Sequence, residues 1–455
     1  MPGRVLMVSP HFPPINAPDH QRVRMCLPYL GEFGWEPHVL TVDPRFVEGF
    51  RDPGLAETVP DEVPVTRVGA LPARLTRRFG LGSLGLRALG PLGRAGDRLL
   101  RTRRFDVVFF STTIFPAMGL GPRWKRRRGV PYVLDMQDPW VSDYYQRTGI
   151  RPPGGRIKYA FAQWLARRGE PRAMRDAARV VSVSPDYPTV LRQRYPDLPA
   201  ERFVVMPFGA SERDADFVRT TGIRHSVFDP SDGLLHWTYL GRGGADMALA
   251  LRGLFLALRR VRSRDPRCER LRLHFVGTSY AGKDRAQKTV APLADKMGVG
   301  DLVHEQTERI PYLEGLALLR ESDAVLLIGS DDATYSASKV YPCVLAGRPL
   351  LAVLHRDGLA GEVIRTCNAG AAVGFASGES LEDLAGRVEP ELTRLLDLPP
   401  GTPAKPDWTA FAPYTAREMT RRLCQVFDEA SPPQRWTNEN AMTAAAAPSH
   451  ATAER

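Results

Sequence analysis

The stretch AVLLIGSDDATYSASKVYPCVLAGRPLLAV, residues 324–353, decides the predicted fold. It opens and closes with an unbroken apolar run, and about twenty residues separate the two runs. Runs that are apolar at every position suit parallel strands that are covered on both faces. Parallel strands need a crossover connection, and a right-handed βαβ unit places a helix there. We therefore predict a strand, a polar loop, a short helix and a second strand within one α/β sheet.

Polar residues cluster where this short helix is expected to begin. Ser336, Ser338 and Lys339 place two hydroxyls and an ammonium beside the free backbone N–H groups of a helix start. Together these groups could bind one anion, such as a phosphate. The alternative is that Ser338 is an ordinary N-cap and Lys339 a solvated residue of the first turn.

Length and composition predict two α/β domains. The chain has 455 residues, of which 43% are hydrophobic and 25% charged, as in ordinary globular proteins. Five scattered cysteines without a C-x-x-C pair indicate neither disulfides nor zinc and favour a reducing cytoplasm. No apolar run reaches the length of a membrane span, so we expect a cytoplasmic protein, peripheral to the membrane at most.

The net charge of +11 suits an anionic substrate, an anionic membrane or nucleic acid, and charge alone does not choose among them. The most basic segment, residues 67–104, holds ten arginines and one acid among regularly spaced leucines. Its leucines could face the interface of an anionic membrane, with the arginines at the headgroups. The other interpretation is a helical pair that faces the protein core and has a solvated basic rim.

Residues able to do chemistry follow two predicted strands near the N-terminus. His11 and Asn16 come after a buried strand that begins at Val5, and Asp135 and Asp138 follow the strand YVLD. In an open α/β sheet, ligands bind at this carboxyl edge. A carboxylate there could hold a sugar hydroxyl or accept a proton, although such residues also serve as turn formers and caps. The histidine could equally be an ordinary loop residue.

A glycine-rich turn follows the strand LHWTYLG. Gly241, Gly243 and Gly244 would let the backbone approach phosphate oxygens, and Arg242 would add a bidentate guanidinium. The pattern is not G-x-G-x-x-G, so a dinucleotide site is not predicted.

Several of these segments, in this order, resemble GT-B glycosyltransferases, especially glycosyltransferase family 4. SASKVYPCVLAGRPLLAV is similar to the family segment K-x-x-E-Y-L-A-x-G-[KR]-P, VSPHFPP to its opening, and YVLDMQDPW to D-x-R-D-P-W. The resemblance spans roughly residues 4–430. This chain departs from the family at Pro342, where a ribose-binding Glu is usual, at Gln137 in place of Arg, and at Phe208 in place of Asn.

The resemblance implies two doubly wound, Rossmann-like domains that face each other across a cleft. We expect an acceptor-side domain at 1–210, a linker at 211–232, a nucleotide-sugar domain at 233–410, a helix at 411–430 that returns to the first domain, and a disordered tail at 431–455.

The same resemblance implies a retaining hexosyltransferase that uses a nucleotide-diphosphate sugar and needs no metal or other cofactor. Asp138, Arg242 and Lys339 would be catalytic. The donor would also contact Gly241, Gly243, Gly244, Ser336, Ser338 and Glu362, and the acceptor His11, Asn16 and Asp135. The acceptor would be a saccharide or a lipid-linked molecule, an anionic membrane surface is a further candidate partner, and nucleic acid is not expected as a partner. A nucleotide-sugar epimerase and a non-catalytic GT-B-like scaffold remain the alternatives.

Overall fold

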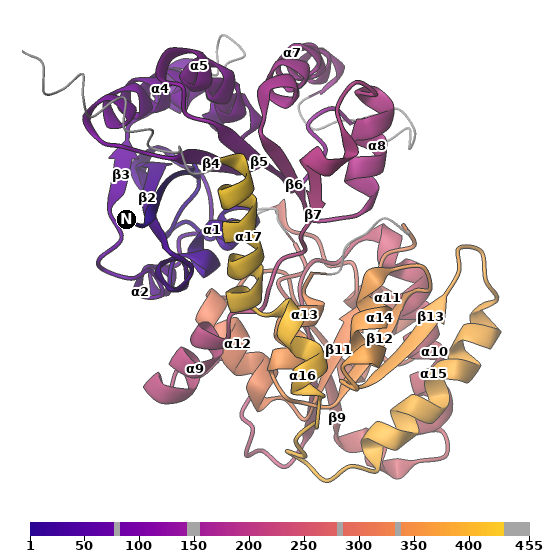
Figure 1. Cartoon of the computed structure of the whole chain (residues 1–455). Coiled ribbons are helices and arrows are strands. Elements are labelled where there is room, and N and C mark those ends of the chain that lie inside the picture. Colours follow the sequence, from indigo (N-terminus) through magenta and orange to yellow (C-terminus); the bar gives the residue numbers. More distant parts are fainter. Residues whose placement is uncertain (77–81, 143–154, 280–284, 333–337, 432–455) are drawn as a thin grey trace, which may run out of the picture.

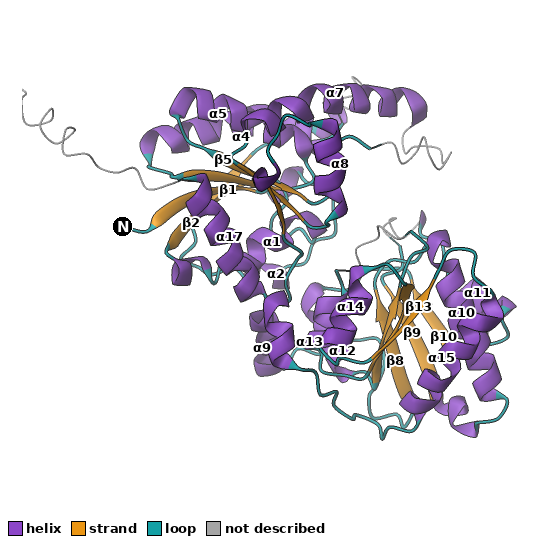
Figure 2. Ribbon diagram, turned by 45° about the vertical axis from the view of Figure 1, so that its right-hand side comes forward, coloured by secondary structure: helices purple, strands orange, loops and turns teal. Residues whose placement is uncertain are grey.

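Two parallel α/β sheets form the computed structural model, which describes residues 1–76, 82–142, 155–279, 285–332 and 338–431 (Figure 1). Helices lie on both sides of each sheet (Figure 2). The predicted pair of doubly wound α/β domains is therefore confirmed. The tail predicted to be disordered lies outside the described residues, apart from Ser431.

The first sheet has the strand order β3-β2-β1-β4-β5-β6-β7, and every pair in it is parallel. Its strands are β1 (Gly3–Val8), β2 (Trp35–Val42), β3 (Val65–Val68), β4 (Val107–Ser111), β5 (Tyr132–Met136), β6 (Arg179–Ser182) and β7 (Phe203–Val205). Because β1 lies between β2 and β4, the order reverses beside it. The loops after β1 and β4 therefore border a crevice.

Alternate residues of β1 supply the two cores of this domain. Val5 and Met7 belong to the core on one face, and Leu6 and Val8 to the core on the other. The helices are α1 (Gln21–Cys26), α2 (Gly54–Glu57), α3 (Ala73–Thr76), α4 (Leu84–Thr102), α5 (Leu120–Arg128), α7 (Gly155–Asp176) and α8 (Asp186–Arg194). Residues of α4, α5 and α7 share one core, and residues of α1 share the other.

The basic segment 67–104 faces the core through α4. Leu84, Leu92 and Leu99 are at most 9% exposed and pack in the core beneath α4. Gly96 allows this close packing, because a Cβ there would collide with the indole of Trp124. The core-facing interpretation is confirmed for α4, and the prediction that these leucines meet a membrane is wrong.

The second sheet has the order β10-β9-β8-β11-β12-β13 and is also parallel. Its strands are β8 (Leu235–Leu240), β9 (Leu271–Val276), β10 (Val303–Gln306), β11 (Ala324–Ile328), β12 (Leu350–His355) and β13 (Ala371–Phe375). The unit predicted from residues 324–353 is present as β11, α13 (Val340–Leu345) and β12. A second crevice lies where the loops leave β8 and β11.

Helices cover both faces of the second sheet. The remaining ones are α10 (Ala248–Arg262), α11 (Ala291–Lys296), α12 (Tyr312–Glu321), α14 (Leu359–Thr366), α15 (Leu381–Leu396) and α16 (Trp408–Phe411). Residues of α10, α11 and α15 share the core on one face, and residues of α12, α13 and α14 the core on the other.

The segment predicted as a linker between the two domains contains a helix, α9 (Glu212–Thr221). Ser211 caps this helix by accepting a hydrogen bond from the Asp214 N–H, and Gly222 ends it with φ 69°. Val218 packs against Leu313 of α12, and buried Asp214 pairs with Arg24. A short, mostly polar helix with so few buried side chains is hard to detect from periodicity, because its stability comes from caps and tertiary contacts.

Helix α17 (Ala416–Ala430) returns to the first domain (Figure 1). Its residues Met419, Leu423 and Phe427 are buried in the same core as Val5 and Met7. The last described helix thus completes the hydrophobic core that contains the first strand of the chain. Among the described residues, no helix combines the length and apolar character needed to cross a bilayer.

Candidate functional site

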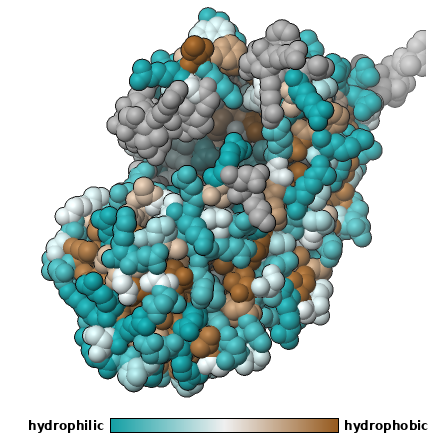
Figure 3. All heavy atoms as spheres, turned by 180° about the vertical axis from the view of Figure 1, so that it is seen from behind, coloured by the Kyte–Doolittle hydropathy of each residue, from teal (hydrophilic) through white to brown (hydrophobic). Residues whose placement is uncertain are grey.

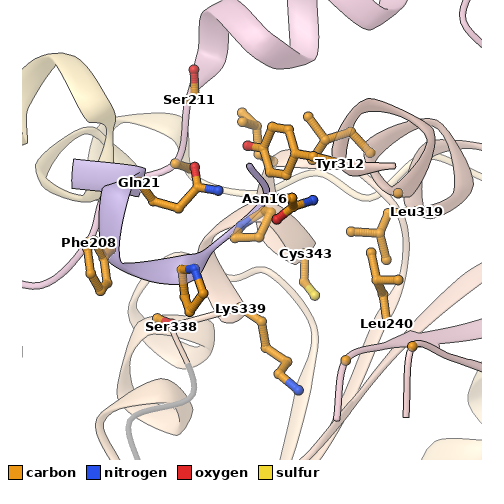
Figure 4. Close-up of a pocket in the computed structure, with 18 of the residues that line it drawn as sticks. Asn16, Gln21, Phe208, Ser211, Leu240, Tyr312, Leu319, Ser338, Lys339 and Cys343 are labelled. Carbon is orange, nitrogen blue, oxygen red and sulfur yellow. The ribbon is translucent and has the colours of Figure 1, made fainter. Parts of the chain in front are cut away.

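A cavity of about 320 Å³ lies between the two domains. The surface is hollowed where the domains meet (Figure 3), and Figure 4 shows side chains from both domains around the cavity. The lining includes Asn16, Gln21, Met25, Phe208, Ser211, Leu240, Gly241, Arg242, Val276, Gly277, Arg309, Tyr312, Leu319, Ser338, Lys339, Pro342 and Cys343. Three of the lining side chains are cationic, and none of the described ones is a carboxylate. The composition of the wall therefore favours an anionic ligand.

Lys339 is placed at this cavity by the start of α13. Its Nζ donates a hydrogen bond to Tyr239 Oη at 2.7 Å and lies 4.5 Å from the centre of the tyrosine ring. Burial lowers the pKa of Lys339 to about 8. Within the described residues no carboxylate accepts a hydrogen bond from this ammonium. A desolvated cation in such surroundings is stabilised when an anion arrives.

Gly241 makes room for that ammonium. Its φ of 145° lies in the region that favours glycine, and a Cβ at this position would collide with Lys339 Nζ. The N–H groups of Gly241 and Gly243 donate to Val276 O and Thr278 O at 2.9 and 2.8 Å. These two donors are engaged in the protein, so the predicted phosphate contact through them does not fit. The glycine turn instead provides space.

Arg242 also lines the cavity, but its guanidinium is already paired. Nη1 and Nη2 donate to the two carboxylate oxygens of Asp246 at 3.0 and 2.7 Å. Burial opposes ionisation of Asp246, yet the hydrogen bonds from Arg242 and Ser330 hold the pKa of this carboxyl below its ordinary value. Arg242 can contact a ligand from this position only by sharing or leaving Asp246.

The start of the short helix α13 differs from the anion-binding helix start that was predicted from the sequence. Ser338 lines the cavity, while Ser336 lies outside the described residues. With six residues, α13 has a small dipole, so Lys339 carries most of the positive charge at this end. Pro342 is the third residue of α13, where a missing N–H costs no intrahelical bond. The helix begins at Val340, two residues before the proline.

Three predicted donor contacts lie away from this wall, since Gly243, Gly244 and Glu362 do not line the cavity. Glu362 is exposed in the first turn of α14. The structure thus brings Gly241, Arg242, Ser338 and Lys339 together and leaves these three out.

Asn16 joins the two domains at the edge of the cavity. Arg309 donates to Asn16 O at 3.2 Å and to Asn16 Oδ1 at 3.1 Å. Asn16 Nδ2 in turn donates to Asp52, whose Oδ2 also accepts the backbone N–H of Tyr312 at 2.6 Å. A carboxylate of the first domain thereby caps α12 of the second. These contacts fix how the cavity walls meet.

The loop after β1 holds a hydrogen-bonded His–Asp pair. His11 Nδ1 lies 2.8 Å from Asp19 Oδ1, and the imidazole is 17% exposed. Asp19 also accepts from Thr112 Oγ1 at 2.9 Å and from the Thr113 N–H at 3.1 Å. Burial raises the pKa of Asp19, but the hydrogen bonds prevail and its pKa lies below the ordinary value. His11 is therefore oriented at the carboxyl edge of the sheet, without lining the cavity.

Asp138 lies near this pair, after β5. Its side chain keeps solvent access, yet desolvation by the surrounding protein and the charge on Asp19 raise the pKa of Asp138 to about 6. A carboxyl group that titrates this close to neutral pH can exchange a proton with a substrate hydroxyl. The acid predicted to be catalytic thus has an environment suited to that role.

These elements of the first domain resemble a known family. Residues 20–209 match the model of the glycosyl transferase 4-like domain. No curated protein matches the chain.

Solved structures extend the likeness to both domains. HepE from Anabaena, in complex with UDP and glucose, has 16% sequence identity and a TM-score of 0.56, with 94% of this chain and 99% of that one covered. A UDP-forming α,α-trehalose-phosphate synthase from Burkholderia xenovorans has 12% identity and a TM-score of 0.58, with 94% and 100% covered. The N-terminal domain of trehalose-6-phosphate phosphatase from Candida albicans has 13% identity and a TM-score of 0.58, with 94% and 97% covered. The chain has the GT-B-like fold that was expected from its motifs.

Within the first domain, Asp135 has a structural position. Its side chain is 0% exposed and accepts from Arg22 Nε at 2.8 Å, Ser111 Oγ at 2.7 Å and Gln137 Nε2 at 2.9 Å. Arg22 also donates to Met206 O at 2.7 Å. The predicted contact between Asp135 and an acceptor does not fit this burial. Its carboxylate instead neutralises a buried arginine that ties α1 to the end of the domain.

Sequence reasoning gave no role to several residues that shape the site. Tyr239 holds Lys339, Asp246 holds Arg242, and Arg309 connects the second domain to the first. Tyr239 and Lys339 are a hundred residues apart, and no local spacing predicts their contact. Among the described residues, no group of three or more His, Cys, Asp or Glu side chains could hold a metal ion.

Proposed function

We propose that the chain is a glycosyltransferase that transfers a sugar from a nucleotide-diphosphate sugar to a saccharide or lipid-linked acceptor. The observation that carries this proposal is Lys339, a desolvated ammonium that has no carboxylate partner among the described residues, in an interdomain cavity whose described wall has no carboxylate. A nucleoside diphosphate supplies the missing negative charge. The UDP named with the similar HepE structure makes UDP the first ligand to test.

In this mechanism the second domain stabilises the leaving diphosphate. Negative charge grows on the diphosphate as the bond to the sugar breaks, and a preorganised cation lowers the barrier most where that charge develops. Lys339 already lies at the cavity, whereas Arg242 would join by sharing its bidentate contact with Asp246. When the diphosphate binds, its negative charge raises the lowered pKa of Lys339 toward the ordinary value of a lysine.

The acceptor would reach the sugar from the first domain. Asp138, with its pKa near 6, would accept a hydrogen bond or proton from the attacking hydroxyl, and the Asp19-oriented His11 would lie beside it. A hexose donor and retention of configuration are the expectation from family 4. The reaction would take place in the cytoplasm or at the inner face of the cell membrane.

Calorimetry with UDP, followed by assays with UDP-sugars, tests the proposal. We expect UDP to bind, and we expect UDP-sugar to be hydrolysed slowly without acceptor and faster with one. A sugar returned to the nucleotide with inverted configuration would instead identify an epimerase. Nucleotide binding without turnover would favour a scaffold. Mass spectrometry of nucleotide sugars retained from a lysate identifies the donor if UDP fails but another nucleotide binds.

A further inference from the structure

The first half of α7 projects from the body of the first domain. None of residues 155–165 is buried, and the first buried residue of this helix is Ala166. Ile157 is 89% exposed, Phe161 43% and Trp164 49%. Three large apolar side chains gather on this one exposed helical segment. Such grouped apolar patches mark interaction sites, whereas single exposed apolar residues elsewhere on a surface are ordinary.

These three side chains lie on one side of the helix. Their spacing of four and then three residues brings them to the same face. The rings of Phe161 and Trp164 stack, with centroids 6.0 Å apart and planes 18° from parallel, and the Arg168 guanidinium lies 4.3 Å from the centre of the Trp164 ring. The apolar face therefore ends in a cation that is already in contact with its aromatic edge.

Exposed cations surround this face. Residues 155–169 include Arg156, Lys158, Arg167 and Arg168, all exposed, and no acidic residue. The positive charge continues along α7 with exposed Arg172 and Arg175 and onto the end of α5, where residues 125–128 are one lysine and three arginines, all exposed. Lys125 Nζ donates to Asp176 O at 2.8 Å, which places the two helix ends side by side. Figure 1 shows α4, α5 and α7 on the side of the first domain away from the second.

We propose that this surface of α7 docks the protein on an anionic lipid bilayer. Ile157, Phe161 and Trp164 would enter the boundary between headgroups and acyl chains, and the cations of α7 and α5 would meet the lipid phosphates. An aliphatic residue that is 89% exposed, next to aromatic rings that stack on each other, suits a lipid interface better than nucleic acid. The inference rests on the proposed function only in linking this surface to a lipid-borne acceptor.

Co-sedimentation with vesicles tests the docking surface without any nucleotide. Full-length protein is mixed with vesicles of phosphatidylcholine alone or of phosphatidylcholine with phosphatidylglycerol, at low and high salt. We expect binding to the anionic vesicles, at least about tenfold stronger than to the neutral ones, and weaker binding as salt screens the cations. Equal recovery with both kinds of vesicle, or recovery with neither, overturns the proposal.

Substitutions in the apolar face give the sharper result. We expect the triple variant Ile157→Ser, Phe161→Ser, Trp164→Ser to lose at least about tenfold in affinity for anionic vesicles. Trp408→Ser is the matched control, since Trp408 is 51% exposed but lies on α16 in the second domain. The control should bind as the native protein does. A triple variant that still binds vesicles overturns the proposal.

Two further measurements exclude other occupants of the surface. Light scattering without lipid compares the oligomeric state of the native protein with that of the triple variant. If the native protein is a dimer and the variant is a monomer, the surface serves self-association and the proposal is overturned. RNA is the second alternative ligand. If the native protein binds RNA at this surface and binds no vesicles, the proposal is overturned. Slow UDP-sugar hydrolysis by the triple variant should equal that of the native protein, so a failure of docking and a failure of the glycosyltransferase proposal give different results.

Discussion

Replacing Lys339 by methionine should stabilise the fold and weaken donor binding together. Burial lowers the pKa of this lysine from 10.5 to about 8, and one pH unit corresponds to about 1.36 kcal/mol. The charged form therefore costs the folded state about 3 kcal/mol at neutral pH. Methionine has a similar length and no charge to desolvate. We expect Lys339→Met to raise the free energy of unfolding of its domain by about 1 to 3 kcal/mol.

The cost has a defined pH window. The folded-state pKa lies below the unfolded one, so between about pH 8 and 10.5 the unfolded chain binds more protons at Lys339. Native stability should rise with pH across that window relative to Lys339→Met, and the difference between the two proteins should shrink as the native lysine becomes neutral in both states. Thermal or urea unfolding followed at pH 7, 8 and 9.5 measures this difference. Conditions must keep the two domains' transitions separable.

The same variant should lose affinity for a nucleoside diphosphate. Removing one charged partner of an anion costs about 1.5 to 3 kcal/mol, which is roughly tenfold to a hundredfold in Kd. Calorimetry with UDP at pH 7 measures it. Binding to the native protein should also weaken above about pH 8, where free Lys339 loses its proton. A variant that is less stable than the native protein and binds UDP equally well would refute the view that Lys339 is a strained cation held for an anion.

Three other results follow from the site. Gly241→Ala should weaken UDP binding about as much as Lys339→Met, because the new Cβ collides with the ammonium and the φ of residue 241 is 145°. The control Gly31→Ala, which has nothing near its Cβ position, should leave the UDP affinity unchanged, and calorimetry compares the two variants. If the Asp138 carboxylate contacts the acceptor, kcat/KM should rise with pH through about 6, and Asp138→Asn should abolish that rise along with most of the activity; a profile that is flat in the native enzyme contradicts this role. Because Pro342 replaces the ribose-binding Glu and no described residue of the wall is a carboxylate, UDP and 2′-deoxy-UDP should bind within about tenfold, and a hundredfold preference for UDP would show that another group reads the ribose.

The apolar runs of residues 324–353 were enough to predict parallel strands of one sheet, while two domains were expected from the chain length and the family 4 resemblance. A strand buried on both faces is apolar throughout, as in β11 and the first five residues of β12, and this pattern is local in the chain. Parallel strands then require crossovers, which orders the elements and places Lys339 and the glycine turn at the carboxyl edge of one sheet. The resemblance to family 4 motifs added the arrangement of the two domains. Segment 67–104 was ambiguous because glycines that permit close packing, such as Gly96, look like helix breakers in the sequence.

The sequence by itself thus determined the strands, the crossovers and the carboxyl edges of the two sheets, where Asp138 follows a strand of the first sheet and Arg242 and Lys339 follow strands of the second. Only the tertiary structure decided which of these groups is available. Whether an ion is neutralised depends on partners that are distant in sequence. Arg22 neutralises Asp135 from 113 residues away, while the partners of Lys339 among the described residues are the hydroxyl and ring of Tyr239. Electrostatic energies depend on separation in space and on burial, and neither quantity is encoded by local spacing.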